Sequence, residues 1–241
     1  MKATILRTNA TPVYGFLSFI IQQQTQGQLG KDVKVLDCGA GGQIPPIAVF
    51  SEQGFDAYGI DISGQQLQLA KEYCAHKKLD VDLRVADMRQ TPFPDAYFDC
   101  VYEHYAMCHL SKKDTAIAIQ EMHRITRPGG FCFLGMISID SFPKSFFGKE
   151  KEVGEFWEDD DRHTMFMNLE ADELVSEWEI LTKEKRVIYL QDAAEEISAE
   201  EWARMNPGLA AGYSEEAWKN LYNQRKNYVN YSHLYYILRK K

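Results

Sequence analysis

Between residues 32 and 138, short apolar runs alternate with longer segments in which apolar residues recur every three or four positions. The short runs are rich in β-branched and aromatic residues and predict strands, whereas the longer segments predict helices. Strands that alternate with helices and are apolar along most of their length are typical of a parallel sheet covered on both faces. We therefore predict a doubly wound α/β domain with strands at 33–38, 57–61, 82–87, 98–104 and 131–138.

Two of the intervening helices have recognisable ends in the sequence. Ser63 with Gln66 forms a capping-box pattern, in which the hydroxyl oxygen accepts from a free N–H of the first helical turn. Ser111 stands in the same position before a later helix, and Pro128-Gly129-Gly130 would end that helix. These signals support the alternation of strands and helices.

After Ile139 the alternation stops. The charged stretch 142–163 predicts a long surface loop, and a short helix near 170–178 and a strand at 179–190 follow it. Residues 191–230 predict an inserted helical pair, and 232–241 predict a closing strand. No repeat or linker divides the chain. We interpret 1–241 as one domain, made of an N-terminal helical lid (1–31), a sheet core (32–190 and 231–241) and the helical insertion (191–230).

Composition excludes several classes of partner. The chain has 27 Lys and Arg against 35 Asp and Glu, a net charge of −8 that opposes binding to a phosphate backbone. The uncharged segment 8–30 holds one apolar stretch of nine residues, whereas a membrane span needs about 20. The five cysteines form no CxxC pair and several lie in apolar runs, which favours a reducing compartment. We expect a soluble, cytoplasmic protein without nucleic-acid or membrane partners.

The most informative motif is VLDCGAGGQ at 35–43, in which a strand ending in Asp37 runs into a glycine-rich loop. Such a loop lets a ligand approach the backbone closely at the start of a helix. The Asp37 carboxylate suits a ligand with a positive group. A nicotinamide-binding loop would require G-x-G-x-x-G, but its third glycine position is Ile44 here. A plain structural turn stays an alternative for this loop.

Further acidic residues end the following strands. Asp61 lies 24 residues after Asp37 at the end of the second strand, where a carboxylate can accept both hydroxyls of a ribose. Asp87 follows the third strand, next to Met88, and Glu103 ends the fourth. Because ligands of open α/β sheets bind outside the carboxyl ends of the strands, these acids are expected to line one crevice.

With these motifs, the chain resembles the class I S-adenosylmethionine-dependent methyltransferases. The resemblance rests on VLDCGAGG, GID, VADM, FDCVYEHYAMCHL and HRITRPGGFCFL, and covers roughly residues 33–187 and the last ten. It departs at Gln43, where the family often has a third glycine. It implies a mostly parallel, seven-stranded, Rossmann-like sheet with an antiparallel C-terminal strand. It also implies in-line displacement of a methyl group from S-adenosyl-L-methionine, here to a small-molecule acceptor.

The resemblance implies a role for each motif residue. The loop before the first helix would hold the methionine moiety, the second strand end the ribose and the third the adenine. Glu103 would lie beside the sulfonium, Ile62 would pack on the adenine and Met88 would stack near it. The implied cofactor-binding residues are Asp37, Gly39, Ala40, Gly41, Asp61, Ile62, Asp87, Met88 and Glu103.

The acceptor side has weaker signals. His104 is the first candidate for a catalytic base, since it follows Glu103 and titrates near neutrality. Candidate substrate residues are Tyr14, Tyr105, Trp157 and His163. Three interpretations are open for the aromatic residues of the insertion: they wall a hydrophobic pocket, form a small core of their own or make an oligomer contact. These residues are Trp202, Tyr213, Trp218, Tyr222 and Tyr228. His109 is interpreted as structural, and His76, His123 and His233 as surface residues.

Three functions are consistent with these patterns. The first is a methyltransferase acting on a small molecule, the second a nicotinamide-dependent oxidoreductase and the third a non-catalytic S-adenosylmethionine-binding protein. No His, Asp or Glu group has a recognisable metal-ligand spacing, so no metal is expected. The acceptor and the oligomeric state do not follow from the sequence.

Overall fold

A computed structural model describes residues 10–141, 147–190, 200, 214–217, 219 and 229–241. Its elements in the first half are α1 (Ala10–Thr25), β1 (Lys34–Cys38), α2 (Ile47–Glu52), β2 (Asp56–Asp61), α3 (Gly64–Lys77), β3 (Val81–Val85), β4 (Phe98–His104), η1 (Met107–His109) and α4 (Lys112–Ile125). The second half contains β5 (Thr126–Ser138), β6 (Lys149–Glu152), β7 (Glu155–Glu158), β8 (Asp161–Phe166), α5 (Asn168–Leu174), β9 (Trp178–Leu190) and β10 (Val229–Lys240).

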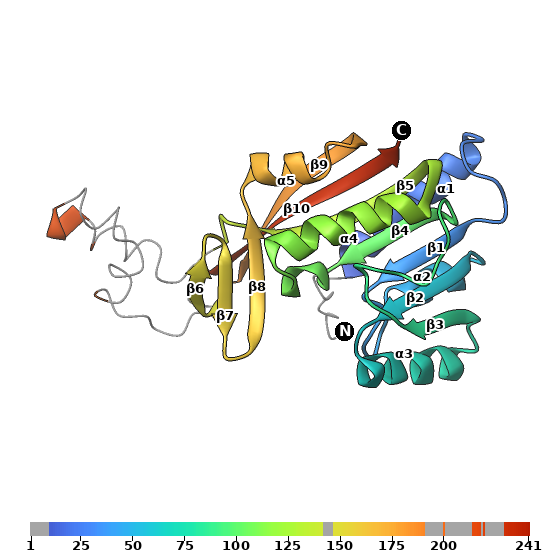
Figure 1. The fold of residues 1–241 in the computed structure, drawn as a ribbon, viewed down its shortest axis with the longest axis horizontal. Coiled ribbons are helices and arrows are strands. Elements are labelled where there is room, and N and C mark those ends of the chain that lie inside the picture. Colours follow the sequence, from blue (N-terminus) through green and yellow to red (C-terminus); the bar gives the residue numbers. More distant parts are fainter. Residues whose placement is uncertain (1–9, 142–146, 191–199, 201–213, 218, 220–228) are drawn as a thin grey trace, which may run out of the picture.

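The strands form one mixed sheet (Figure 1). Its main body has the order β3-β2-β1-β4-β5-β10-β9, and its first five strands are mutually parallel. The last strand, β10, lies between β5 and β9 and runs antiparallel to both. The predicted doubly wound sheet with an antiparallel C-terminal strand is therefore confirmed. The predicted total of seven strands is wrong, because three more strands extend the sheet to ten.

The extra strands come from the segment predicted as a surface loop. β6, β7 and β8 form an antiparallel meander that replaces most of the expected loop at 142–163. All four residues of β6 are exposed, and its sequence is KEKE. Charged edge strands protect a sheet against unwanted pairing, so an edge strand of this kind has the composition of a loop. Turns at Gly154 and Asp159, both with positive φ, connect the three strands.

The meander joins the sheet because β5 is longer than its neighbour. Pairing between β4 and β5 ends at His104 opposite Gly135. Farther along β5, Ile137 and Ser138 pair with Met165 and Phe166 of β8 in a parallel register. The meander therefore lies just beyond the carboxyl end of β4, at the edge where the predicted site residues are found.

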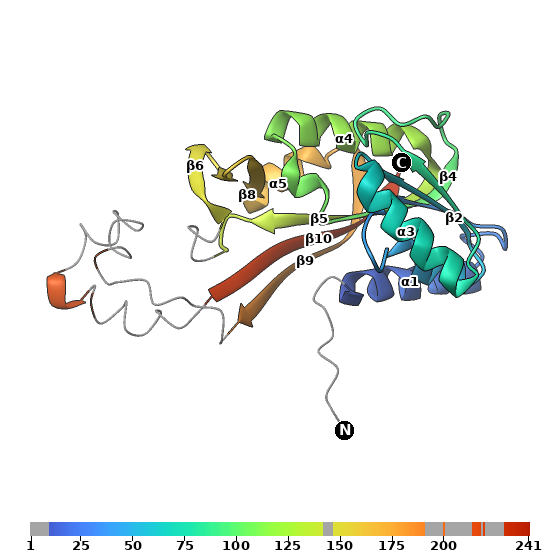
Figure 2. The ribbon, with the colours of Figure 1, turned by 90° about the horizontal axis from the view of Figure 1, so that it is seen from below.

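Helices cover both faces of the sheet (Figure 2). One face packs against α1, α2 and α3, with Phe16, Phe50, Tyr102 and Phe133 among its largest buried side chains. The opposite face packs against α4 and α5 through apolar residues such as Met122. Both predicted N-caps are present, since Ser63 accepts from the Gln66 N–H and Ser111 from the Asp114 N–H. Each face therefore has its own apolar core.

Two predictions about composition can be compared with the structure. All five cysteines are free and buried, as expected of small apolar residues in the core. Among the described helices, none is long and apolar enough to cross a membrane. The predicted helical pair at 191–230, with its aromatic residues Trp202, Tyr213, Trp218, Tyr222 and Tyr228, lies almost entirely outside the described residues.

Candidate functional site

The register of the sheet brings the predicted acids to one edge. Asp37 of β1 is paired with Gly59 of β2 on one side and with Tyr102 of β4 on the other. Asp61 and Glu103 follow these partners by two residues and one residue. The ends of β1, β2 and β4 therefore present Asp37, Asp61 and Glu103 around the start of the glycine-rich loop.

The glycine-rich loop is hydrogen-bonded to the end of β2. The Gly39 N–H donates to the Ile60 carbonyl at 2.8 Å, and the Gly41 N–H donates to Asp61 Oδ2 at 3.0 Å. Gly39 has a φ of +113°, and a Cβ there would overlap the Cβ of Ala106. A Cβ at Gly41 would overlap the Asp61 carboxylate. Both positions therefore require glycine, and the loop leaves bare backbone at the carboxyl edge of the sheet.

Asp37 is a buried carboxyl group with a structural role. Its side chain is 1% exposed, and Oδ2 accepts from the N–H of Ile47, the first residue of α2. Burial raises the pKa of Asp37 to about 8, and the charges of Glu103 and Asp61 act in the same direction. Ionisation of Asp37 therefore costs free energy unless a positive charge lies beside the carboxylate.

Glu103 is fully buried one residue beyond Tyr102. Its Oε1 accepts from the N–H groups of Ala106 at 3.0 Å and Met107 at 2.7 Å. Its Oε2 is buried and has no hydrogen-bond partner among the described groups. Burial raises the pKa of Glu103 to about 7. Two buried carboxyl groups near a bare backbone loop would both be relieved by a positively charged ligand.

Asp61 lies at the second strand end and is tied by two backbone donors. Its Oδ1 accepts from the Ser63 N–H at 2.8 Å, while Oδ2 accepts from Gly41. The next residue, Ile62, is 69% exposed, and Val85 of β3, whose Cα pairs with that of Asp61, is 60% exposed. A carboxylate beside two exposed apolar side chains can hold a ligand that has hydroxyl groups and a flat ring.

Asp87 forms an ion pair with Arg89, which was not among the predicted site residues. The guanidinium of Arg89 contacts both of its carboxylate oxygens, at 3.0 Å and 2.6 Å. This ion pair holds the pKa of Asp87 below its usual range. Arg89 also reaches Asp114 at 3.2 Å. Met88 is half-buried and packs against the core below α4, so only part of it is available to a ligand.

His104 differs from the expected base. Its ring is 8% exposed, and Nε2 lies 3.3 Å from the hydroxyl of Tyr235. Burial, together with the charges of His233 and Arg186, lowers the pKa of His104 to about 3. The ring is therefore neutral at physiological pH and a weak base.

His233 is a residue that the sequence analysis assigned wrongly to the surface. It is 2% exposed, and both ring nitrogens are buried without a hydrogen-bond partner among the described groups. The error has a physical reason: β10 is an interior strand, so its side chains are covered where a closing edge strand would leave them open. The His233 ring stacks on Tyr235 at 5.5 Å and lies 5.0 Å from Tyr105.

These rings form a cluster at the end of β4 and beside the last residues of β5, which we call the ring cluster: His104, Tyr105, Tyr231, His233 and Tyr235. Its centroid separations run from 4.7 Å for His104–Tyr105 to 6.1 Å for Tyr105–Tyr231. Tyr105 has a φ of +73°, an unusual conformation for a bulky residue that is typical of functional turns. The cluster has both apolar surface and polar atoms.

The other substrate candidates do not converge on one point. Tyr14 lies on α1 and is 52% exposed. Trp157 of β7 stacks under the cationic groups of Lys151 and Arg162. It is paired with Arg162, and Phe156 with His163, so alternation directs Trp157 and His163 to opposite faces of the meander.

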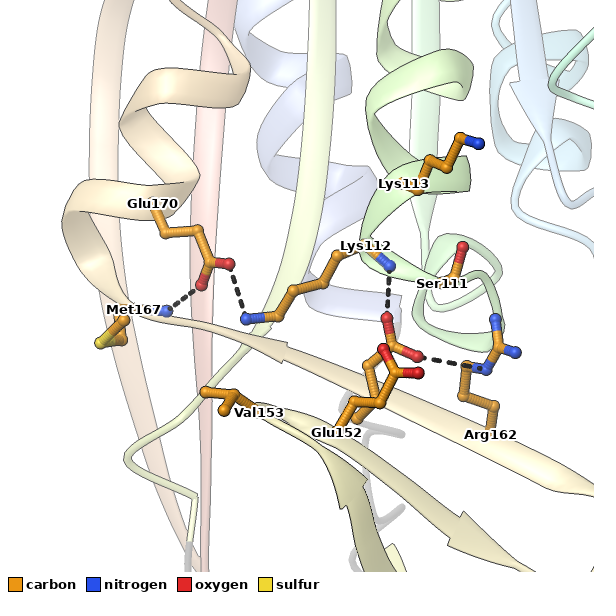
Figure 3. A pocket seen from close by; sticks show the side chains of 9 residues that line it. Ser111, Lys112, Lys113, Glu152, Val153, Arg162, Met167 and Glu170 are labelled. Atoms are coloured by element: carbon orange, nitrogen blue, oxygen red, sulfur yellow. Dashed lines mark hydrogen bonds and ion pairs between the residues drawn. The ribbon is translucent and has the colours of Figure 1, made fainter.

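A separate pocket of about 640 Å³ lies between the N-terminus of α4 and the meander (Figure 3). Charged side chains line much of it, and several pair with each other. Lys112 contacts Glu170 at 2.6 Å, and Arg162 lies 3.6 Å from Glu155. None of the predicted cofactor residues is among its described lining residues. This pocket is therefore distinct from the strand-end site.

Comparisons with known proteins agree with this geometry. Residues 36–134 match a family model described as a methyltransferase domain. Over 103 residues the chain is 33% identical to a sterol 24-C-methyltransferase of Pneumocystis carinii, covering 42% of this chain and 26% of the relative. Over 106 residues it is 35% identical to a 27-O-demethylrifamycin SV methyltransferase of Amycolatopsis mediterranei, covering 42% and 38%. The chain thus spans less than half the length of these relatives.

The fold comparison covers more of the chain. A crystal structure of a SAM-dependent methyltransferase from Methanosarcina mazei superposes with a TM-score of 0.63 over 90% of this chain and 96% of its own, at 18% identity. At that identity the likeness concerns the fold. The segment matched by the family model contains Asp37, the glycine-rich loop, Asp61, Asp87 and Glu103. Residues 36–134 therefore match a methyltransferase domain, and the sheet has the fold seen in that crystal structure.

Proposed function

We propose that this protein transfers a methyl group from S-adenosyl-L-methionine to a small-molecule acceptor by in-line displacement. The observation that carries the proposal is the pair of buried carboxyl groups, Asp37 and Glu103, at the bare backbone of the glycine-rich loop. A buried carboxylate with an unpartnered oxygen is stabilised by a cationic ligand. S-adenosyl-L-methionine, when bound, supplies a methyl group on a positively charged sulfur and also carries an ammonium group.

The strand-end residues divide the cofactor among them. The backbone from Gly39 to Gly41, including Ala40, faces the methionine moiety, and the Asp37 and Glu103 carboxylates balance its positive charges. Asp61 accepts from the ribose hydroxyls, and exposed Ile62 packs on the adenine. Asp87 accepts from the adenine amine beside Met88, with Arg89 holding the carboxylate in place. The unpartnered Glu103 Oε2, and the two positions at which a Cβ would not fit, support this assignment.

The ring cluster forms the acceptor side in this proposal. Tyr105, Tyr231 and Tyr235 offer flat apolar surface, and the unpartnered nitrogens of His233 offer hydrogen bonds to a polar group of the acceptor. His104, with a pKa of about 3, serves as a neutral contact and not as the main base. Much of the rate would then come from holding donor and acceptor in line. The names of the relatives include both carbon and oxygen methylation, so either atom type fits.

The proposal also includes the cellular compartment of the protein and the class of molecule that it binds. Five buried thiols without a disulfide support a reducing compartment, and we place the protein in the cytoplasm. The net charge of −8 supports a small molecule over a nucleic acid as the partner.

Thermal unfolding with three ligands tests the cofactor. S-adenosylmethionine, S-adenosylhomocysteine and NAD are compared at equal concentration. At about 100 times its dissociation constant a ligand stabilises by roughly 2.7 kcal/mol, which raises the midpoint by about 5–10 °C in a chain of this size. We expect this shift with the two adenosyl ligands and none with NAD. A shift with NAD alone would show a nicotinamide-dependent oxidoreductase and reject the proposal.

A second experiment separates a methyltransferase from a non-catalytic binding protein. Protein loaded with S-adenosylmethionine carrying a labelled methyl group is incubated with a panel of small molecules that have phenol, enol or activated carbon acceptors. Asp61→Ala serves as the matched control, since it removes the proposed ribose contact. We expect labelled product with the parent protein and none with the variant. Equal labelling by both proteins would reject the assignment of the site.

A further inference from the structure

Three potential metal ligands meet between η1 and the meander, outside the proposed cofactor site. They are His109, at the end of η1, and Asp161 and His163, both on β8. One ligand atom from each lies within 4.8 Å of the other two. His109 Nδ1 is 2.8 Å from Asp161 Oδ1, and His163 Nε2 is 3.8 Å from Asp161 Oδ2. The two imidazole rings are 5.3 Å apart.

The fold fixes this convergence. Asp161 and His163 are two positions apart on a strand, so they project from the same face of β8. The adjacent Thr164 donates its hydroxyl to the Leu110 carbonyl at 2.5 Å, and the Lys112 N–H donates to Glu155 of β7 at 2.8 Å. These two bonds hold the meander against the segment that directly follows His109. The three ligands are therefore supplied by rigid, mutually bonded segments.

We propose that His109, Asp161 and His163 bind a divalent first-row transition metal ion, with zinc as the representative ion. Two imidazole nitrogens and one carboxylate oxygen form a recurring donor set for such ions, and they leave further coordination positions open. Ligands at 2.0–2.2 Å from one tetrahedral ion lie about 3.3–3.6 Å apart. The ligand atoms here lie within 4.8 Å of one another, so side-chain rotations that move an atom by about 1 Å at the exposed His109 and Asp161 bring them to that spacing.

Without the ion, the His109 Nδ1–H can donate to Asp161 Oδ1 at 2.8 Å and to the Arg162 carbonyl at 3.0 Å. Metal binding requires Nδ1 to carry a lone pair, so the imidazole proton moves to Nε2. The ion then replaces the hydrogen bond as the link between η1 and β8.

The surroundings favour a cation and leave it accessible. Glu158 is paired with Asp161 across the β7–β8 turn, so a second carboxylate lies on the same face. The side chains of His109 and Asp161 are 46% and 57% exposed, whereas that of His163 is 18% exposed. One ligand is thus anchored in the interior and two face solvent. The open coordination positions are directed to water or to an incoming oxygen or nitrogen ligand.

Metal binding is measured on the whole, untagged chain after treatment with a chelator and dialysis. Zn²⁺ is titrated by calorimetry, and Co²⁺ is followed by its visible absorption. We expect one equivalent to bind and the unfolding midpoint to rise. His109→Gln and Asp161→Asn, which alter exposed side chains and should not perturb folding, are each expected to weaken binding by about 10-fold or more. His76→Gln, an exposed histidine on α3, is the matched control and should bind like the parent.

The expected visible absorption of bound Co²⁺ should disappear in His163→Ala, with folding verified by circular dichroism. The proposal would be overturned by less than one equivalent bound at millimolar Zn²⁺. It would also be overturned if Asp161→Asn and His76→Gln bound with equal affinity. The experiment is independent of the proposed methyl transfer, because it requires neither S-adenosylmethionine nor an acceptor.

Discussion

The two halves of the carboxyl edge are built from the sequence in different ways. On the half formed by β2, β1 and β4, Asp37, the glycine-rich loop and Asp61 follow each other within 25 residues and each ends or follows a strand. On the half that begins at the end of β4 and includes β5 and β10, Tyr105, Tyr231 and His233 come from segments more than 120 residues apart. The first half has a local motif that identifies its ligand class. The second is assembled by strand pairing alone, so its chemistry emerges only from the fold.

The halves also differ in what burial does to their polar groups. Burial raises the pKa of Asp37 and Glu103, so both carboxyl groups favour a positively charged ligand. Burial lowers the pKa of His104 and His233, so both rings stay neutral. One half thus suits a cation and the other a neutral acceptor. The following predictions test this division, from the largest expected effect to the smallest.

Glu103→Gln should affect the cation-binding half alone. The amide oxygen of glutamine can still accept from the N–H groups of Ala106 and Met107, but the negative charge is lost. Affinity for S-adenosylmethionine should therefore fall by about 100-fold or more. The raised pKa of Glu103 in the folded state means that its ionisation costs stability as pH rises from 4.5 to about 7. The empty variant should therefore be more stable than the parent above pH 7.

Calorimetry and thermal unfolding at pH 8 measure both effects. The control is Glu152→Gln, which alters an exposed glutamate on β6 and should change neither quantity. An unchanged affinity in Glu103→Gln would remove Glu103 from the cofactor site.

The affinity for S-adenosylmethionine should depend on pH. Below a pKa of about 8 the empty protein holds a proton on Asp37, and a cationic ligand must displace it. Affinity should therefore rise with pH by up to about 10-fold per unit between pH 6 and 8, and level off above that. Titrations in buffers with different ionisation enthalpies would detect the released proton. A flat profile between pH 6 and 8 would contradict a direct contact between the cation and this carboxyl group.

His233→Phe should alter the acceptor half without changing the cofactor half. Replacing two unpartnered buried nitrogens by carbon should raise the free energy of unfolding by about 1–2 kcal/mol. Methyl transfer should fall while the affinity for S-adenosylmethionine stays the same. Chemical denaturation and calorimetry separate these outcomes, and His76→Phe is the exposed control. A large loss of stability would mean that the ring nitrogens have an essential partner.

Thr164→Val removes the hydroxyl that bonds the meander to the Leu110 carbonyl. Because the partner carbonyl loses its donor, we expect a loss of about 1 kcal/mol in the free energy of unfolding. Cofactor affinity should not change, since the glycine-rich loop is hydrogen-bonded to β2 and α3 and not to the meander. Thr182→Val, at an exposed position on β9, is the matched control. A change in cofactor affinity would show that the halves are coupled.

The sequence predicts the alternating core well for a physical reason. Buried parallel strands such as 98–104 are apolar along their length, and helix caps such as Ser63 and Ser111 have a local hydrogen-bond chemistry. Both signals are present within a few residues. The meeting of Asp37, Asp61 and Glu103 could be predicted for the same reason, because strand ends of a doubly wound sheet meet at one edge.

The meander, the burial of His233 and the group of His109, Asp161 and His163 could not be predicted, because residues far apart in the sequence form them. The KEKE sequence of β6 is that of an exposed edge strand and has no apolar alternation. His233 looks like a surface residue until β10 is placed between two strands. His109 is separated by more than 50 residues from Asp161 and His163, so no ligand spacing is visible in the chain. Arg89, which holds Asp87, could have been suspected as a cation two residues from an acid.

The length of β5 has a consequence for how such a protein can change over generations. One edge of β5 pairs first with β4, which contains Glu103, and farther along with β8, the last strand of the meander. Ile137 and Ser138 pair with β8 through main-chain groups, which any side chain allows. Another hairpin could therefore replace the meander without disturbing the ends of β1, β2 and β4. A single long strand thus allows the meander to be replaced while the strand ends that present Asp37, Asp61 and Glu103 stay in place.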